Sequence, residues 1–527
     1  MTPFKRLFVA ALAVLLVAGI APIGHSDTNR LMLVRVHPDS AAQAEYVLSH
    51  FDDTHNNTAG SIELLLWPGD LARLDALHAD YDVVTTDLVA RDQALGGTAA
   101  DSVQHLPGPN RSDYRRLGDY NDEMKAMAKK DPGLVETFKM PRPSLEGRTI
   151  YGIEIAANVK DENDGRPVFY IDGVHHAREW PAGEYPMIFA HYLVDNYGKD
   201  KEITSLLHRV RVILVPIVNV DGFDYSRESL AQNDNLGAGN GFEGYWRKNR
   251  RSLTGVTVSA PRQVNPDAYG VDPNRNYAYL WGDGHGGSSG EVYDQTYRGD
   301  APFSEPETQD VRDIILSRPV TMVLTNHTYQ GSVLRTGGGT SPEDGILERL
   351  GQKVANILGY DNAPTVGYPT TGTTDDWAYA AMDSLGYTIE HGTIGFHPPY
   401  DQEVGSFWKQ HVNAFMVLLR AAADPDYHSI IRGRVAGGPA KLTITKSFVT
   451  KLSPENPTGE AGYPEKLKMS ITTDKNGYFE WHLSPSDRPY EKKPESFTLT
   501  IQAGSKTKVL NVHVERGQTL DLGTLTL

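Results

Sequence analysis

The stretch from Pro167 to Trp180, PVFYIDGVHHAREW, decides the fold. Its first half is a mostly apolar run, which is typical of a strand buried on both faces of a sheet. The run ends directly in His175 and His176, and Arg178 and Glu179 follow. A His and a Glu three residues apart can converge on one metal ion if the strand ends in a tight turn. The stretch therefore predicts a buried strand with candidate metal ligands at its carboxyl end.

Two further apolar runs have the same character. Residues 209–220, RVRVILVPIVNV, and 320–327, VTMVLTNH, each indicate a buried strand, and the second ends at His327. In open α/β sheets ligands gather outside the carboxyl ends of the strands. Two His and one Glu with an open position form the ligand set of a catalytic zinc that activates water. The alternative is that each is an ordinary hydrogen-bonded residue, because the chain contains 18 His.

The pattern around these strands predicts an α/β fold in which helices flank a mixed sheet. From Tyr114 onward, apolar strands alternate with amphipathic helical stretches such as 182–197 and 406–423, which favours a mixed or parallel sheet. The last helical stretch stops at Asp424-Pro425, so we expect this domain to span residues 113–424.

Two smaller domains are predicted to flank it. Residues 27–95 contain strand, helix, strand, helix and strand patterns in turn, which predicts a small α+β domain. Residues 96–112 are rich in Gly, Pro and Ser and predict an exposed linker. Residues 427–527 contain short alternating strands, which predict an all-β sandwich. Within it, Asn476-Gly477 lies between two alternating runs and predicts a β-hairpin.

Composition excludes several classes of function. The 527 residues include no Cys, so any metal must be held by His and carboxylates. Lys and Arg number 51 against 67 Asp and Glu, a net charge of −16, and this argues against a nucleic-acid partner.

The N-terminus has the pattern of a signal peptide. Residues 1–26 contain Lys5 and Arg6, then the apolar stretch 7–20, then small residues before the expected cleavage point. The apolar stretch is shorter than the ~20 residues that a membrane-spanning helix needs. We therefore expect a secreted protein, extracellular or periplasmic, with no membrane span in the mature chain.

A series of short motifs resembles one enzyme family. HAREW, YWRKNR, GVDPNRN, NHTY and YTIE, the last after a GTTDDW segment, occur in the order found in zinc metallocarboxypeptidases. The resemblance is to the carboxypeptidase A/B type and its bacterial relatives, and it covers residues 114–422. It implies a zinc-dependent exopeptidase, with one Zn²⁺ per catalytic domain, that removes single residues from the C-termini of peptides or proteins.

The resemblance also implies roles for individual residues at the metal. The three zinc ligands of the family correspond to His176, Glu179 and His327, whereas His175 is one residue out of register and is left out. Asp272 in GVDPNRN matches the aspartate that orients the first zinc histidine.

Two residues match the family's catalytic groups. Glu390 in YTIE corresponds to the general base, which takes a proton from water and passes it to the leaving amine. Arg247 in YWRKNR corresponds to the arginine that polarises the scissile carbonyl and stabilises the oxyanion.

Other matches concern substrate binding. Asn274 and Arg275 correspond to the pair that grips the free C-terminal carboxylate, since a guanidinium matches a carboxylate in bidentate fashion. Arg178 corresponds to an arginine that contacts substrate beside the metal, and Tyr368 corresponds to a mobile tyrosine that caps the substrate.

Specificity is expected to depend on Asp375. In the family, an aspartate at this position lies at the base of the pocket for the terminal side chain and favours Lys or Arg. Arg335 stands where the animal enzymes usually have an aromatic residue, and it could neutralise Asp375 or shift the preference. A mixed or hydrophobic preference therefore stays open.

The resemblance extends to the flanking domains. The N-terminal domain resembles a propeptide that covers the cleft until the linker is cut, and the alternative is a permanent accessory domain. The C-terminal domain resembles the transthyretin-like sandwich appended to some metallocarboxypeptidases. Two rival functions are a catalytically inactive peptide-binding protein on the same scaffold and a carboxypeptidase that trims cell-wall peptides. The sequence leaves the oligomeric state open.

Overall fold

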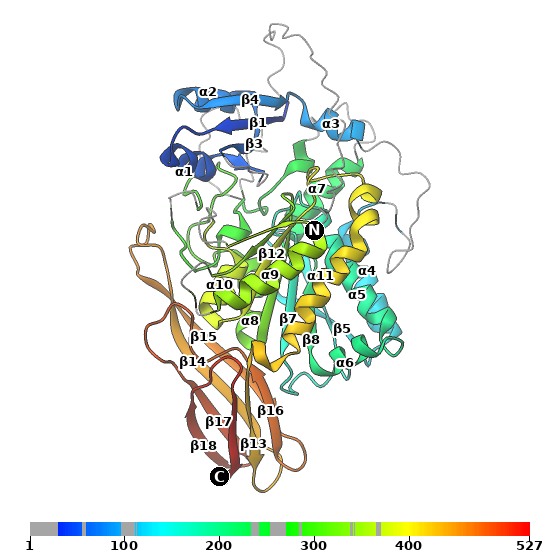
Figure 1. Ribbon diagram of the computed structural model, residues 1–527, viewed down its shortest axis with the longest axis vertical. Coiled ribbons are helices and arrows are strands. Elements are labelled where there is room, and N and C mark those ends of the chain that lie inside the picture. Colours follow the sequence, from blue (N-terminus) through cyan, green and yellow to red (C-terminus); the bar gives the residue numbers. More distant parts are fainter. Residues whose placement is uncertain are drawn as a thin grey trace, which may run out of the picture.

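The computed structural model describes residues 30–54, 60–95, 111, 113–232, 242–252, 270–283, 287–337, 341, 343–364 and 370–527. Three parts follow one another along its long axis: a small N-terminal sheet, a large helix-flanked sheet and a group of C-terminal strands (Figure 1). The expected signal peptide lies outside the described residues, as does the expected linker apart from Arg111. Within the described ranges, no helix is both long enough and apolar enough to cross a membrane.

The N-terminal part is a four-stranded antiparallel sheet in the order β2-β3-β1-β4. The predicted alternation of strands and helices is present, with the short β2 and the helix α3 in addition. Because β2 has only two residues, it leaves no periodic pattern in the sequence. The elements are β1 (Met32–His37), α1 (Ala41–His50), β2 (Asp52–Asp53), β3 (Ile62–Leu66), α2 (Leu71–Ala76), β4 (Asp80–Thr85) and α3 (Leu88–Leu95).

The central part is a mixed sheet, as predicted, and it has eight strands in the order β11-β10-β12-β9-β7-β8-β6-β5. Its inner strands β12, β9, β7 and β8 are parallel, so their carboxyl ends meet at one edge. The strands are β5 (Val135–Pro143), β6 (Thr149–Ile155), β7 (Val168–Gly173), β8 (Arg211–Val215), β9 (Val320–Thr328), β10 (Ser332–Arg335), β11 (Asp361–Pro364) and β12 (Leu385–His391). Strands β7, β8, β9 and β12 are buried along their whole length, which explains their apolar runs.

Helices cover both faces of this sheet (Figure 1). On one face the Tyr387 hydroxyl donates to the Leu347 carbonyl of α9, and His391 lies against aromatic rings of α5 and α11. On the other face Thr388 donates to Asp375 of α10, as strand alternation requires. The helices are α4 (Leu117–Lys130), α5 (Pro181–Asn196), α6 (Lys201–Arg209), α7 (Val220–Gln232), α8 (Pro306–Ser317), α9 (Asp344–Leu358), α10 (Thr374–Met382) and α11 (Ser406–Ala422).

The C-terminal part is a β structure of two sheets, β16-β13-β19 and β15-β14-β17-β18. The predicted hairpin at Asn476-Gly477 is wrong, because β15 pairs with β14 whereas β16 pairs with β13 in the other sheet. The turn therefore carries the chain between sheets. The strands are β13 (Ser429–Val435), β14 (Lys441–Lys451), β15 (Gly462–Thr472), β16 (Tyr478–Leu483), β17 (Phe497–Ala503), β18 (Lys506–Val512) and β19 (Thr519–Leu525).

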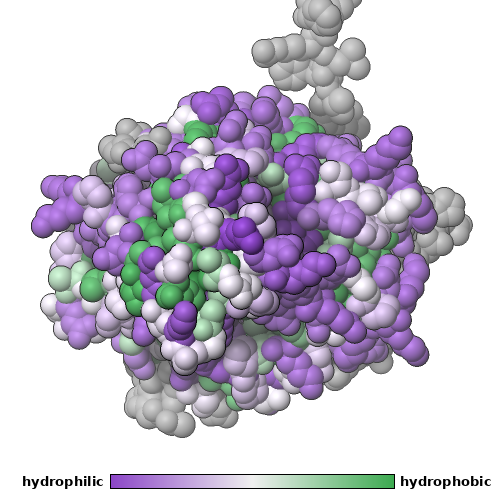
Figure 2. Space-filling model, turned by 90° about the horizontal axis from the view of Figure 1, so that it is seen from below, coloured by the Kyte–Doolittle hydropathy of each residue, from purple (hydrophilic) through white to green (hydrophobic). Residues whose placement is uncertain are grey.

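Seen from the end that carries the C-terminal sheets, the surface is mainly hydrophilic with several separate hydrophobic areas (Figure 2). Exposed large apolar side chains of these strands include Val449, Tyr478 and Val509. Strand β19 alternates exposed and intermediate residues along most of its length and buries only Leu525.

Candidate active site

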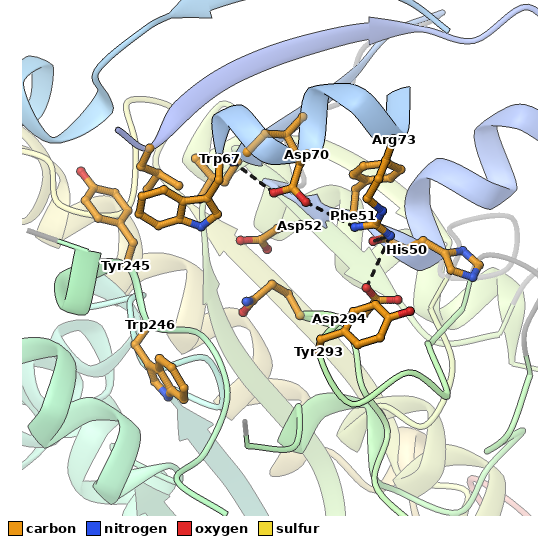
Figure 3. A pocket seen from close by; sticks show the side chains of 14 residues that line it. His50, Phe51, Asp52, Trp67, Asp70, Arg73, Tyr245, Trp246, Tyr293 and Asp294 are labelled. Carbon is orange, nitrogen blue, oxygen red and sulfur yellow. Dashed lines mark hydrogen bonds and ion pairs between the residues drawn. The ribbon is translucent and has the colours of Figure 1, made fainter. Parts of the chain in front are cut away.

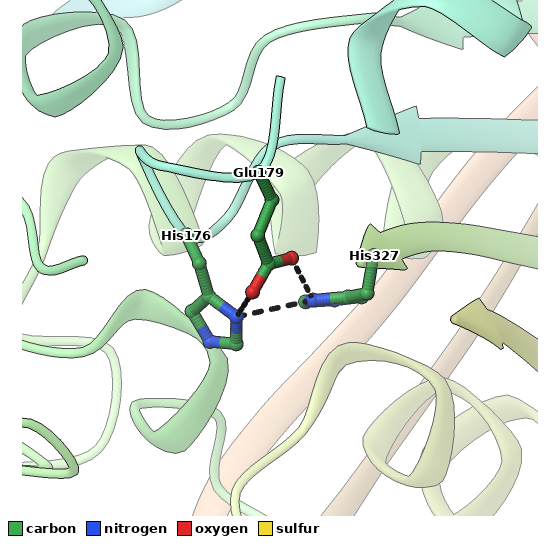
Figure 4. A group of neighbouring side chains, drawn as sticks. All are labelled: His176, Glu179 and His327. Carbon is green, nitrogen blue, oxygen red and sulfur yellow. Dashed lines mark hydrogen bonds and ion pairs between the residues drawn. The ribbon is translucent and has the colours of Figure 1, made fainter. Parts of the chain in front are cut away.

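The carboxyl ends of two parallel strands bring three candidate ligands together. Strand β7 ends at Gly173, and Val174 then adopts a left-handed backbone with φ of 52°. This is the tight turn that the ligand spacing required, and it is an unusual conformation for a β-branched residue. It directs His176 and Glu179 toward the end of β9, where His327 lies (Figure 4).

The three side chains form one compact, buried group. One ligand atom from each of His176, Glu179 and His327 lies within 4.8 Å of the others. The His176 Nδ1 is 2.7 Å from Glu179 Oε1 and 3.2 Å from His327 Nδ1, and His327 Nδ1 is 3.0 Å from Glu179 Oε2. Each residue is at most 1% exposed. Within the described part of the chain, no other such group occurs.

Asp272 orients the first histidine from behind. Its Oδ1 lies 3.1 Å from His176 Nε2 and accepts the backbone N–H of Asn274 at 2.9 Å. Its Oδ2 accepts from Arg247 Nε at 3.1 Å and Nη2 at 2.9 Å. Burial alone would raise the pKa of Asp272, but Arg247 and His176 outweigh it and hold the pKa well below its usual range. Asp272 is therefore a charged acceptor.

These contacts suit His176 to metal binding. Burial, followed by the nearby Arg247, lowers the pKa of His176 to about 4, so the ring is neutral near neutral pH. With its Nε2 hydrogen directed at Asp272, the lone pair on Nδ1 faces Glu179 and His327. A carboxylate that orients a metal-binding imidazole in this way is common at zinc sites.

The donor set fits zinc. Two nitrogens bound tetrahedrally at ~2.05 Å from one zinc ion would lie about 3.3 Å apart, and the two Nδ1 atoms are separated by 3.2 Å. Nitrogen and carboxylate donors also match the zinc preference. The predicted ligands His176, Glu179 and His327 are thus brought together as the metal requires.

Glu390 is placed beside this group by strand register. In the parallel pair β9–β12, Glu390 is directly opposite His327. The two side chains therefore lie next to each other on one face of the sheet. Glu390 is buried, with 4% of its surface exposed. The predicted general base is therefore next to the metal ligands.

Arg247 reaches the same place from a loop. The carbonyl of Arg247 accepts the backbone N–H of Ala177, between the ligands His176 and Glu179. Its guanidinium pairs with Asp272. Burial alone would lower the pKa of Arg247, but nearby carboxylates, Asp272 first among them, raise it above its usual range. A permanent cation thus lies close to His176, and the side chain of Asp272 contacts both residues.

The carboxylate-binding pair predicted from GVDPNRN also adjoins the metal group. Asn274 and Arg275 belong to a short 3₁₀ turn, Pro273–Arg275. The Asn274 Nδ2 lies 3.2 Å from His327 Nε2, while its Oδ1 accepts from Thr374 N at 3.0 Å and Thr374 Oγ1 at 3.2 Å. Arg275 Nη1 donates to the Asn274 carbonyl at 2.8 Å. Thr374, which the sequence analysis did not name, therefore fixes the amide of Asn274.

Asp375 begins α10 on the same side of the sheet. It is 1% exposed and accepts a hydrogen bond from Thr388 Oγ1 at 2.9 Å. Burial raises its pKa above the usual range. Arg335, considered as a partner for Asp375, instead donates to Asn362 at 3.3 Å and stands opposite Tyr387, on the other face from Thr388. Arg335 therefore does not neutralise Asp375.

Arg178 is held by the N-terminal part. Its Nη1 and Nη2 donate to the two carboxylate oxygens of Asp52 at 2.5 and 2.7 Å, and the guanidinium lies 4.3 Å from the centroid of the Phe396 ring. Asp52 belongs to β2, and no signal in the sequence connected it with Arg178. The predicted substrate arginine is thus occupied by a carboxylate of the same chain.

A small cavity of about 40 Å³ lies beside this pair, between the N-terminal and central parts (Figure 3). Asp52 and Trp67 line it from the N-terminal side, and Trp246, which precedes Arg247, lines it from the central side. Arg73 crosses the interface to Asp294 at 3.7 Å. An apolar cluster also spans both parts, formed by Leu31, Leu33, Leu65, Leu88, Tyr245, Tyr329 and Phe396.

His175, which the sequence analysis left out of the metal group, lies between Tyr277 and Thr374. Its Nε2 is 2.9 Å from the Tyr277 hydroxyl and 2.8 Å from Thr374 Oγ1, and it is fully buried. It therefore supports the pocket and does not join the metal group. In the sequence, only its position next to His176 indicated that His175 lies near the site. Tyr368 lies outside the described residues.

Together these features define a site of the kind found in zinc hydrolases, a buried group of metal-binding side chains with Glu390 and Arg247 beside it. Residues 120–414, more than half of the chain, match the family model described as zinc carboxypeptidase. The chain belongs to the zinc carboxypeptidase family. It is a zinc metallocarboxypeptidase, and thus a hydrolase that acts as an exopeptidase.

Individual relatives agree with this assignment. Carboxypeptidase B of Helicoverpa zea is 28% identical over 390 residues, which cover 69% of this chain and 83% of the relative. Mouse carboxypeptidase A4 is 28% identical over 337 residues, covering 60% of this chain and 72% of the relative. The structure of carboxypeptidase A from Helicoverpa armigera matches the fold with a TM-score of 0.59 at 21% identity, covering 76% of this chain and 99% of that one.

Proposed function

We propose that the chain holds one zinc ion on His176, Glu179 and His327 and removes single residues from peptide C-termini, with a preference for Lys and Arg. The observation that carries the proposal is the convergence of these buried donors beside Glu390 and the Arg247–Asp272 pair. When bound, zinc supplies a Lewis acid that polarises a carbonyl and lowers the pKa of a water ligand.

The residues around the metal group have distinct tasks. Glu390, next to His327 in the sheet, accepts a proton from the attacking water and delivers it to the leaving amine. Arg247 stabilises the negative charge that develops on the scissile oxygen, and its contact with Asp272 fixes the guanidinium before the reaction begins. Asp272 thereby positions both Arg247 and His176.

Recognition of the chain end is assigned to the neighbouring turn. Asn274 and Arg275 bind the free carboxylate, which distinguishes a C-terminus from an internal peptide bond. Asp375 accepts the cationic side chain of a terminal Lys or Arg, because a buried carboxylate gains most from an opposite charge. The position of Arg335 on the opposite face of the sheet supports this preference.

We further propose that residues 30–95 keep the site covered until the chain is cut within 96–112. The bidentate contact of Asp52 with Arg178 supports this, because it occupies a proposed substrate-binding group. The shared apolar cluster supplies additional contact between the two parts. The signal-like pattern of residues 1–26 supports secretion, extracellular or periplasmic.

The test is a panel of blocked dipeptides ending in Arg, Lys, Leu or Phe, together with cell-wall peptide fragments. The full chain is assayed before and after limited proteolysis, with zinc content measured on the same samples. We expect one zinc per chain, low activity before cleavage, and faster release of Arg and Lys than of Leu and Phe.

Other results would point to the rivals. Zinc binding without hydrolysis of any peptide would indicate an inactive binding protein, and cleavage of the wall fragments alone would indicate a cell-wall enzyme. Equal activity before and after cleavage would indicate that residues 30–95 form a permanent accessory domain.

A further inference from the structure

Helix α10 connects the proposed pocket with the C-terminal β part. Its first two residues, Thr374 and Asp375, touch Asn274 and Thr388 on the pocket side. The rest of the helix is almost entirely buried, with Trp377 fully inaccessible. Because a short helix moves as one body, contacts made further along it also set where Thr374 and Asp375 lie.

The middle of α10 is held by a carboxylate from strand β15. The indole Nε1 of Trp377 donates to Glu465 Oε1 at 3.2 Å and Oε2 at 3.1 Å. The same carboxylate accepts from the Thr450 hydroxyl of β14, and Glu465 is 7% exposed. Burial raises the pKa of Glu465 to about 7, so near neutral pH this side chain holds the indole as an acceptor that carries only part of its charge. Trp377 is two residues from Asp375.

The end of α10 is held by an arginine that follows β18. Asp383, the C-cap residue, has a left-handed backbone with φ of 54°. Arg516 Nη2 donates to the Asp383 carbonyl at 2.7 Å and lies 2.6 Å from its Oδ1. Its Nη1 donates to the Tyr427 carbonyl at 2.6 Å, so the guanidinium is itself fixed.

The segment that precedes α10 is also covered from the C-terminal part. Gly372 exchanges backbone hydrogen bonds with Tyr277 and Tyr279, just after the carboxylate-binding turn. The Tyr279 ring is stacked on Tyr490, with centroids 5.3 Å apart and an angle of 6° between the planes. At Gly282, with φ of 91°, an added Cβ would lie 2.3 Å from Asn456 Cβ. The central and C-terminal parts therefore also meet in close contact at Tyr279 and Gly282.

We propose that Glu465 and Arg516 are positioning residues for the specificity pocket, acting through Trp377 and Asp383 on the helix that presents Asp375. The C-terminal β part is then a component of substrate selection as well as an appended domain. This inference rests on the proposed function, because it concerns the pocket to which the terminal side chain binds.

The test uses the full chain, cleaved within 96–112, with separate kcat and KM values for blocked dipeptides ending in Arg and in Leu. Glu465→Leu removes the acceptor of Trp377, and Glu465→Gln restores an acceptor without the charge. Asp521→Asn is the matched control, because it removes a carboxylate from an exposed ion pair with Arg432 in the same part. Thermal unfolding and zinc content are measured for each variant.

We expect Glu465→Leu to raise KM for the Arg peptide about tenfold, a loss of about 1.4 kcal/mol in binding, because Asp375 shifts with α10. The value of kcat should change less than about threefold on the same scale, and zinc content should be unchanged. Glu465→Gln should recover most of the loss, and Asp521→Asn should match the unaltered chain. Arg516→Met should act in the same direction, and it provides the test if Glu465→Leu does not fold.

The inference is overturned if the folded variants show unchanged KM, or if KM for both peptides rises by the same factor. It is also overturned if thermal stability falls while the kinetic constants stay the same. Failure of the proposed function would be recognised differently, because the unaltered chain itself would then hydrolyse neither peptide or would favour Leu. In the latter case a selective rise in KM for Leu would still support the positioning role.

Discussion

Replacing Asp375 with Asn should reverse the preference for basic residues. Asp375 is 1% exposed and accepts a hydrogen bond from the neutral Thr388 hydroxyl, so a bound cation would be its main charged partner. Removing one member of a buried ion pair costs about 3 kcal/mol or more. At ~1.4 kcal/mol per factor of ten, kcat/KM for Arg and Lys peptides should fall at least about 100-fold.

The same substitution should spare uncharged substrates. Asn has nearly the size of Asp and can still accept the Thr388 hydrogen bond, so the shape of the pocket is retained. Peptides ending in Leu or Phe no longer place an apolar group against a carboxylate, and their kcat/KM should stay constant or rise. The assay is initial-rate hydrolysis of four blocked dipeptides that differ only in the terminal residue, after cleavage within 96–112.

Asp376→Asn provides the matched control, because it makes the same change of charge one residue further along α10. Asp376 accepts from Thr373 Oγ1 at 3.2 Å and is only partly buried. The control should keep the ratio of Arg to Leu hydrolysis. If Asp375→Asn lowers both rates equally, or leaves the ratio unchanged, the carboxylate does not select the terminal side chain and the reasoning fails.

Four further predictions concern the metal site, the covering domain and stability. Glu390→Gln should abolish turnover while zinc content, measured by atomic absorption, stays the same; appreciable turnover would remove Glu390 from its role. Asp272→Asn should weaken zinc affinity ~10- to 100-fold in competition with a chelator, as loss of a supporting carboxylate usually does. Asp52→Asn should raise the activity of the uncut chain but not of the cut chain, and an equal effect on both would argue against a covering role. Burial, and then Glu305, raise the pKa of Glu307 to about 8. The stabilising effect of its neutral form is therefore complete below the ordinary pKa near 4.5 and lost as pH rises through 8. The free energy of unfolding should fall by at most about 1.4 kcal/mol per pH unit across that window, and Glu307→Gln should reduce the slope seen by denaturant titration.

The strands that carry the metal ligands could be predicted because their signals are local. An apolar run that ends in His176 and Glu179, and another that ends in His327, each indicate a buried strand with ligands at its carboxyl end. The general rule for open α/β sheets then places these ends at one edge. That the two runs form adjacent parallel strands was not visible in the sequence, and it is the pairing of β7 with β9 that brings the ligands within reach.

The roles of Glu390 and Asp272 depended on the resemblance to a family. Nothing in the neighbouring residues distinguishes Glu390 from an ordinary strand residue, because its position depends on the register of β12 against β9. Asp272 likewise acquires its function from contacts with His176 and Arg247, which are 96 and 25 residues away in the chain. Motif order supplied what local patterns could not.

Features that depend on pairing over long distances were missed. Asp52 lies in a two-residue strand and meets Arg178 across 126 residues, so no local pattern reveals it. The Asn476-Gly477 turn has a hairpin sequence, but packing distributes its flanking strands between two sheets. Arg335 could not be assigned to a face of the sheet without the register of β10 against β12.

The pairing of β9 with β12 has a consequence for how activity is lost on heating. Glu390 and His327 stand side by side because a backbone ladder inside an eight-stranded sheet holds them there. Central strands open only when the whole domain unfolds, whereas surface segments open locally. Amide hydrogens of β9 and β12 should therefore exchange with solvent only through global unfolding, and hydrolysis should persist until that same transition. Insertions in the surrounding loops can alter which peptides enter the site, while the spacing between the two residues stays as the sheet sets it.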